Sequence, residues 1–212
     1  MKTSKNPIVA GIDVGGARKG FHGVALVGGV YQAQLHTMDA AAMARWLREI
    51  GAQAIGVDAP CRWSLDGRAR PAERELMGQG MQCFASPTRE AAVRHPSNYY
   101  GWMLNGEALY QAIEPSHPLC AGLPLRQGQT CCFETFPHAV SCALIGHLVS
   151  AQHKRVVRRV VLEQAGIFSP ELSNIDWIDA ALCALAAHRL AAGHPCHAYG
   201  EPVTGLIITP QT

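Results

Sequence analysis

The chain has 212 residues, which is long enough for one well-buried domain with a large insertion but short for two full domains. Hydrophobic residues make up 48% of it and charged residues 16%, which is typical of a packed globular protein and not of a disordered or fibrous one. The formal charge of +2 is close to neutral, so a nucleic-acid partner would have to be held by a local basic patch.

The sequence predicts a cytoplasmic protein without a membrane partner. Residues 1–6 are polar and lack the apolar core of a signal peptide, and no apolar stretch is long enough to span a bilayer. The eight cysteines lie in apolar surroundings without regular spacing, so we expect most of them to be thiols that fill the core. The oligomeric state stays open.

The first part of the chain predicts three strands, a helix and a fourth strand. Residues 8–13, 21–27 and 30–37 are apolar or alternating runs joined by Gly-rich connections too short for a crossover, which favours an antiparallel meander. Asp39 is a good N-cap for a helix whose apolar positions recur at helical spacing. Residues 54–58 form a buried-type strand, which we expect to lie parallel to a meander strand because a helix precedes it.

The second part resumes after a weaker pattern. Residues 60–129 are rich in proline, Arg, Glu and aromatic residues, and we interpret them as an inserted, partly helical cap. After it we expect a strand at residues 130–136, helices at 138–150 and 152–166, and a long helix from near Ser173 to Gly193. Residues 206–209 form a last short strand or an extended tail. The prediction is a single α/β domain over residues 1–212, whose mixed five-stranded sheet combines the three-strand antiparallel meander with two parallel strands and is flanked by helices.

Three acids follow or interrupt apolar strand runs, and the strand order places them together. Asp13, Asp58 and Glu134 sit at or near the carboxyl ends of strands that should open on one edge of the sheet. Carboxylates this close would repel and take up protons unless a cation neutralised them. Hard oxygen ligands with open positions suit Mg²⁺ or Mn²⁺.

A fourth acid comes from the long helix. Asp179 lies on the same face as Leu182, Cys183 and Ala186, where an unpartnered carboxylate is costly, so a ligand role is expected. Asp176, one turn earlier, could reach the same site.

Each acid also has a simpler interpretation. Asp13 and Asp58 could be ordinary turn residues, and Glu134 could be an inward acid paired with an arginine. Asp176 could form a capping box with Ser173. The metal hypothesis depends on the whole set.

Several stretches that span most of the chain carry a family resemblance: Gly11-Ile12-Asp13, Ile55-Gly56-Val57-Asp58-Ala59-Pro60, the helix at residues 70–78 with Cys83-Phe84-Ala85-Ser86-Pro87 after it, Phe133-Glu134-Thr135-Phe136-Pro137, and Asp176-Trp177-Ile178-Asp179-Ala180. They resemble an uncharacterised domain-of-unknown-function family of predicted RNase H-like nucleases, within the ribonuclease H-like superfamily. The last stretch is also similar to the Asp-x-x-Asp-Ala helix motif of RuvC-type Holliday-junction resolvases. The resemblance implies an RNase H-like fold and a metal pair held by Asp13, Asp58, Glu134 and Asp179.

The implied activity is two-metal hydrolysis of phosphodiester bonds in DNA or RNA. Gly15 and Gly16 would let a phosphate approach the backbone, and Arg18 and Lys19 could meet it, although each fits a solvated turn equally well. The run His153-Lys154-Arg155 with Arg158-Arg159 could follow a phosphate backbone or be a solvated helix face. Trp63, Tyr99, Tyr100 and Trp102 could stack on bases, but core packing explains them too.

Three rival interpretations remain. Residues 11–16 also resemble the first phosphate loop of sugar kinases and actin-like ATPases, although two such domains need a longer chain. A zinc module could draw on His117, Cys120, Cys131, Cys132, His138 or Cys142, but His117 and Cys120 have no second matching pair. The third is a non-catalytic binding domain on the same fold.

Overall fold

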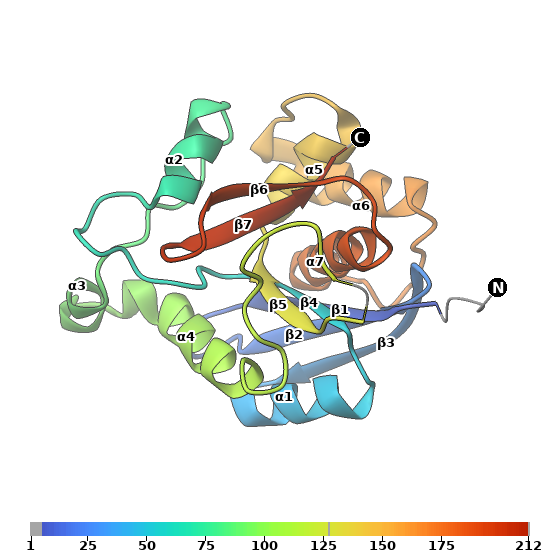
Figure 1. The fold of residues 1–212 in the computed structure, drawn as a ribbon, viewed down its shortest axis with the longest axis horizontal. Helices are drawn as coiled ribbons and strands as arrows, with labels where there is room; N and C mark the ends of the chain where they lie inside the picture. Colours follow the sequence, from blue (N-terminus) through green and yellow to red (C-terminus); the bar gives the residue numbers. More distant parts are fainter. Residues whose placement is uncertain (1–5, 127, 212) are drawn as a thin grey trace.

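The computed structural model describes residues 6–126 and 128–211, so residues 1–5, which entered the prediction of a cytoplasmic protein, lie outside it. Its described strands form one mixed sheet in the order β3-β2-β1-β4-β5-β7-β6 (Figure 1). Strands β1 (Ile8–Val14), β2 (Phe21–Val27) and β3 (Val30–Thr37) form the predicted antiparallel meander. Strand β4 (Ala54–Asp58) is parallel to β1, and β5 (Cys131–Glu134) is parallel to β4, as predicted.

Over the described residues the sheet has seven strands, so the predicted count of five is wrong. Strand β7 (Gly205–Pro210) pairs parallel with β5, and β6 (Cys196–Glu201) pairs antiparallel with β7. Residues 206–209 are thus a strand and not a tail. The sequence pattern of β6 is weak because it lies at the sheet edge, where most of its side chains are only half-buried and need not alternate.

Helices cover both faces of the sheet (Figure 1). One face carries α1 (Ala40–Glu49) and α4 (Gly101–Ile113), while α5 (Pro137–Ile145), α6 (Lys154–Gln164) and α7 (Ile175–Ala191) lie over the other. Asp39 caps α1 as predicted, because its side chain accepts a hydrogen bond from the backbone N of Ala41 at 2.9 Å. Helix α5 ends earlier than predicted, because Gly146 takes a left-handed conformation there. No described helix is both long enough and apolar enough to cross a membrane.

The segment between β4 and β5 is partly helical, as predicted. It contains α2 (Pro71–Gly78), α3 (Arg89–Arg94), the 3₁₀ helix η1 (Asn98–Tyr100) and α4, and a second 3₁₀ helix, η2 (Ala151–His153), precedes α6. Helix α4 does more than cap the sheet, since Leu109 and Ile113 are buried in one core with Met43 and Leu47 of α1. Part of this segment therefore belongs to the hydrophobic core on the α1 side of the sheet.

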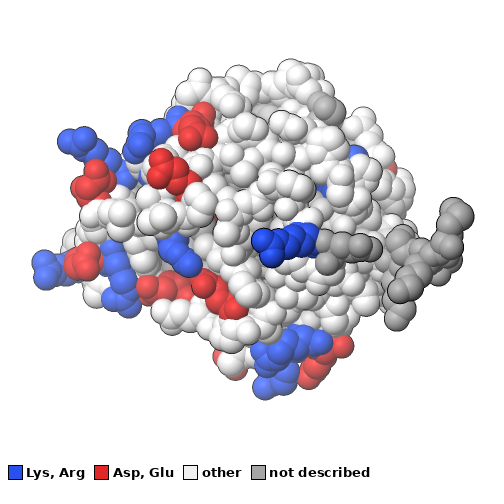
Figure 2. Space-filling model, in the orientation of Figure 1, with Lys and Arg blue, Asp and Glu red and all other residues white. Residues whose placement is uncertain are grey.

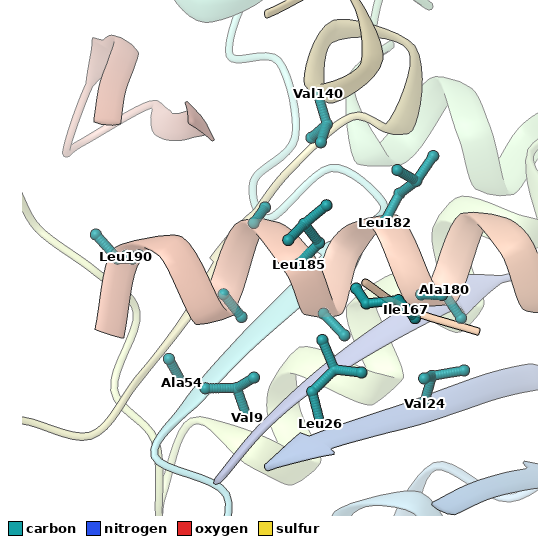
Figure 3. Close-up of a cluster of buried hydrophobic side chains, with 14 of the residues drawn as sticks. Val9, Val24, Leu26, Ala54, Val140, Ile167, Ala180, Leu182, Leu185 and Leu190 are labelled. Atoms are coloured by element: carbon teal, nitrogen blue, oxygen red, sulfur yellow. The ribbon is translucent and has the colours of Figure 1, made fainter. Parts of the chain in front are cut away.

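The largest core lies between α7 and the sheet. Figure 3 shows Val9, Val24 and Leu26 pointing from β1 and β2 towards α7, and Leu182 and Leu185 pointing from the other side of α7 towards Val140 of α5. Helix α7 is thus buried on both sides, which fits its almost uniformly apolar sequence.

Candidate metal centre

Asp13 and Asp58 lie side by side at the carboxyl ends of the two central parallel strands. They are register partners in the β1–β4 pair. Their neighbours Ile12 and Val57 pack in the core with α1 and α4, so strand alternation turns the two carboxylates to the α7 face.

A close approach of α7 brings the third acid to them. Gly11 and Gly56 are also register partners and lie under α7. A Cβ atom on Gly11 would lie 2.0 Å from the backbone N of Ala184, and one on Gly56 would lie 2.5 Å from the backbone O of Cys183. Only glycine allows this helix-to-sheet contact, which carries Asp179 towards the strand ends.

Asp13, Asp58 and Asp179 each offer a carboxylate oxygen, and these oxygens lie within 4.8 Å of one another. Burial, followed by repulsion from Asp179 and Asp176, raises the pKa of Asp13 to about 8. Burial and the charge of Asp13 raise the pKa of Asp58 well above its usual value. The group therefore needs a cation to stay ionised at neutral pH, and a divalent ion that prefers oxygen ligands, such as Mg²⁺ or Mn²⁺, fits it.

Arg158 of α6 already supplies one positive charge to this group. Its Nη1 donates to Oδ1 of Asp179 in a short ion pair, and its side chain is only 8% exposed. Burial raises the pKa of Asp179 while Arg158 lowers it. The Nε of Arg158 is buried and has no hydrogen-bond partner among the described residues, so the guanidinium has bonding capacity left.

Asp176 belongs to a second group with Asp13 and His22, whose ligand atoms also lie within 4.8 Å of one another. The alternative interpretation, a capping box with Ser173, is wrong, because α7 is capped by Asn174, which accepts from the backbone N of Trp177 at 3.0 Å. Asp176 instead accepts two hydrogen bonds from Lys19 Nζ, at 2.9 and 3.1 Å. Burial and the nearby His36 lower the pKa of His22, while the charge of Asp176 acts to raise it.

The structure does not bring Glu134 into either acidic group. Cys131 and Phe133 pack on the α7 side, so alternation turns Glu134 to the opposite face from Asp58. There Arg70 holds it with two bonds, Nη2 to Oε1 at 2.7 Å and Nη1 to Oε2 at 2.9 Å. The interpretation of Glu134 as an inward acid paired with an arginine describes this arrangement.

The Arg70 network extends to a second acid. The Nε of Arg70 donates to Oε1 of Glu73 at 2.8 Å, and the backbone N of Cys61 donates to Glu134 at 2.9 Å. Arg70, Glu73 and Glu134 are all buried. The network ties α2 to the end of β5.

The predicted phosphate-contacting residues are placed as follows. The backbone N of Gly15 donates to Gly20 O at 2.8 Å, so the loop is closed on itself, while the space beside Gly16 is open. Arg18 is exposed in the turn. Lys154 and Arg155 are exposed at the start of α6, with Nη2 of Arg155 donating to Ser173 O at 2.7 Å.

A small recess of about 70 Å³ opens beside Asp58 and is lined in part by Thr135, Phe84 and Trp102. The rings of Phe84 and Trp102 meet edge to face, with centroids 5.6 Å apart. The hydroxyl of Thr135 is buried without a partner among the described residues. Tyr99 is exposed, Tyr100 is half-buried, and Trp63 donates to Glu107 at 2.9 Å.

Charged side chains of both signs are mixed on the face drawn in Figure 2, mainly over α2, α3 and α4 and around α1. The upper right of this face is largely uncharged. The described part of this face therefore has no extended patch of one sign.

The residues of the rival zinc interpretation do not form a metal site among the described residues. Within residues 6–126 and 128–211, neither of the two groups suited to a metal contains a cysteine. His117 is buried with its Nε2 2.7 Å from Ala52 O. His138 lies near Cys142, with Nε2 and Sγ 3.8 Å apart, and both belong to α5.

Sequence reasoning missed His22 and Arg70, and it included Arg158 in a basic helix run without its contact to Asp179. His22 could have been found, because antiparallel pairing of the first two strands places it directly opposite Asp13. The contacts of the two arginines could not, because their partners lie 21 and 64 residues away in the chain.

The fold and the site together define a mixed α/β protein with an acidic candidate metal centre at the carboxyl ends of its central parallel strands. The chain belongs to the family described as "Protein of unknown function (DUF429)", which matches residues 11–204. Searches among curated proteins and among solved structures found no match.

Proposed function

We propose that this protein is an RNase H-like nuclease that uses Mg²⁺ or Mn²⁺ to hydrolyse phosphodiester bonds in DNA or RNA. The observation that carries the proposal is the convergence of Asp13, Asp58 and Asp179 from β1, β4 and α7. The RNase H-like assignment is supported by the order of the first five strands, a meander followed by two parallel strands, with acids at their ends.

Each residue has a defined task in this proposal. Asp13, Asp58 and Asp179 hold a divalent ion, which when bound polarises a phosphate oxygen and activates water. Arg158 supports Asp179, and its Nε, which has no hydrogen-bond partner among the described residues, is the donor that this proposal assigns to a phosphate oxygen. Glu134 has no ligand task, because both of its oxygens are used by Arg70.

The test is a cleavage assay with Mg²⁺ or Mn²⁺ on single-stranded, duplex and branched DNA and RNA. We expect Asp13→Asn and Asp58→Asn to reduce cleavage by about 100-fold or more, since each variant loses a negatively charged ligand of the metal ion. Asp39→Asn is the matched control, because asparagine caps a helix as well as aspartate does and Asp39 lies outside both acidic groups.

Two outcomes contradict the proposal: no cleavage of any substrate by the wild-type protein, or equal cleavage by the variants. Metal binding without cleavage would favour the non-catalytic binding domain. ATP binding in calorimetry would favour the sugar-kinase and actin-like interpretation.

A further inference from the structure

We propose that His22 is a metal ligand, and that Asp13, His22 and Asp176 bind a second divalent cation that is a first-row transition metal in preference to Mg²⁺. The proposal deepens the proposed function and rests on it, since Asp13 belongs to both acidic groups. It adds a nitrogen ligand and a metal preference.

The fold places these three side chains together by strand pairing. Asp13 and His22 are direct register partners in the antiparallel β1–β2 pair, so their side chains stand on the same face of the sheet. Asp176 comes from the first turn of α7, which lies over that face. The three ligand atoms lie within 4.8 Å of one another, close enough to surround one ion.

His22 has an unmet bonding requirement at this position. The residue is 8% exposed, and its Nδ1 is buried without a hydrogen-bond partner among the described residues. Leaving a ring nitrogen buried and unbonded costs free energy, which a ligand at the site would offset. The ring is held in place by Trp177, edge-on with centroids 4.6 Å apart, and by His36 at 4.5 Å.

Lys19 places a positive charge next to Asp176 in this group. Lys19 Nζ bonds both oxygens of Asp176, but the Lys19 side chain is 60% exposed. An exposed ion pair contributes little free energy, so an incoming divalent ion can displace the lysine at small cost.

The ligand set decides the kind of metal. Mg²⁺ prefers an octahedron of oxygen atoms and retains several waters, whereas imidazole raises affinity for first-row transition ions. One imidazole with two carboxylates therefore favours an ion such as Mn²⁺ or Fe²⁺ over Mg²⁺. Mn²⁺ is the useful probe, because its unpaired electrons report directly bound nitrogen.

The experiment is pulsed electron paramagnetic resonance on the full chain, stripped of metal and loaded with Mn²⁺. We expect ¹⁴N modulation from a coordinated imidazole, which disappears when the protein is made with ¹⁵N-histidine. The modulation should also disappear in His22→Asn and persist in His36→Asn, the neighbouring imidazole outside the group. Excess Mg²⁺ should not remove it.

The inference is overturned if the protein binds no Mn²⁺, or if bound Mn²⁺ shows no nitrogen modulation. It is also overturned if the modulation survives in His22→Asn, or if an equal concentration of Mg²⁺ displaces the bound Mn²⁺. If His22→Asn does not fold, persistence of the modulation in His36→Asn assigns the nitrogen to His22, and its loss in His36→Asn overturns the inference. Cleavage in Mg²⁺ is measured separately. Cleavage without nitrogen modulation contradicts only the proposal that His22 is a ligand, and modulation without cleavage contradicts only the nuclease proposal.

Discussion

Asp13 is the most strongly constrained acid of the candidate site, because it belongs to both groups and its burial opposes ionisation. Its pKa is raised to about 8 from an ordinary value of 3.8. An acid whose pKa is raised on folding stabilises the folded state below its unfolded pKa, and that contribution is lost as the pH rises through the folded pKa.

The metal-free protein should therefore lose stability as the pH rises from 5 to 8. We expect a loss on the order of 2–4 kcal/mol in the free energy of unfolding, and a smaller loss in Asp13→Asn. Urea unfolding at both pH values with a chelator present measures the difference. Saturating Mg²⁺ should reduce the pH dependence of the wild type, and an identical dependence in the wild type and Asp13→Asn would contradict this account.

Glu134 is predicted to stabilise the protein without binding metal. Glu134→Gln leaves the buried guanidinium of Arg70 with one ionised partner fewer, and it should lower the free energy of unfolding by about 3 kcal/mol or more. Its Mg²⁺ affinity, measured by calorimetry, should stay within about twofold of wild type because the site lies on the other sheet face. Asp58→Asn provides the contrast, with reduced Mg²⁺ affinity, and a similar loss in Glu134→Gln would return Glu134 to the ligand set.

At the scale of elements, the contact of α7 with β1 and β4 decides whether the acids meet. Gly11→Ala introduces a Cβ atom 2.1 Å from the backbone O of Ala180, which α7 can relieve only by moving away. We expect a loss of about 2–4 kcal/mol in the free energy of unfolding and weaker Mg²⁺ binding, since Asp179 moves with the helix.

The matched control for this contact is Gly16→Ala, whose added atom meets nothing within 4 Å. Its free energy of unfolding should change by no more than about 0.5 kcal/mol. Equal effects of the two substitutions would show that helix approach is not what Gly11 permits.

The contact of α6 with α7 through Arg158 and Asp179 should compete with metal. Arg158→Gln removes a positive charge from the acidic group, so the metal-free variant should have a lower Tm. The rise in Tm on adding Mg²⁺ should be larger than in wild type, because the ion meets less electrostatic repulsion. Arg159→Gln is the control, since Arg159 Nη2 donates to the backbone O of Leu172 and has no acidic partner among the described residues. Equal rises in Arg158→Gln and wild type would exclude competition.

At the scale of the whole molecule, local patterns predicted much of the fold. The meander, α1 and the two parallel strands follow from apolar runs, glycine breaks and the Asp39 cap, all of which depend on neighbours in sequence. Strand β6 was missed because only Tyr199 of its six residues is buried, so its sequence shows no clear alternation.

The acids were placed at the correct strand ends, but their faces were not considered. Alternation along β5, counted from Cys131, predicts that Glu134 lies on the opposite face of the sheet from Asp58. The pairing of Glu134 with Arg70 could not be predicted, because it depends on a contact between residues far apart in the sequence.

The segment between β4 and β5 also determines how the two margins of the sheet differ. Helix α2 lies against β6, where the backbone N of Gly200 donates to Glu75 Oε2 at 3.0 Å and Tyr199 OH donates to Gln79 Oε1 at 3.1 Å. At the opposite margin β3 has β2 on one side only. Helix α2 thus shields the β6 edge from pairing with a strand of another molecule. Any edge-to-edge aggregation between copies at high concentration is therefore expected to start at β3.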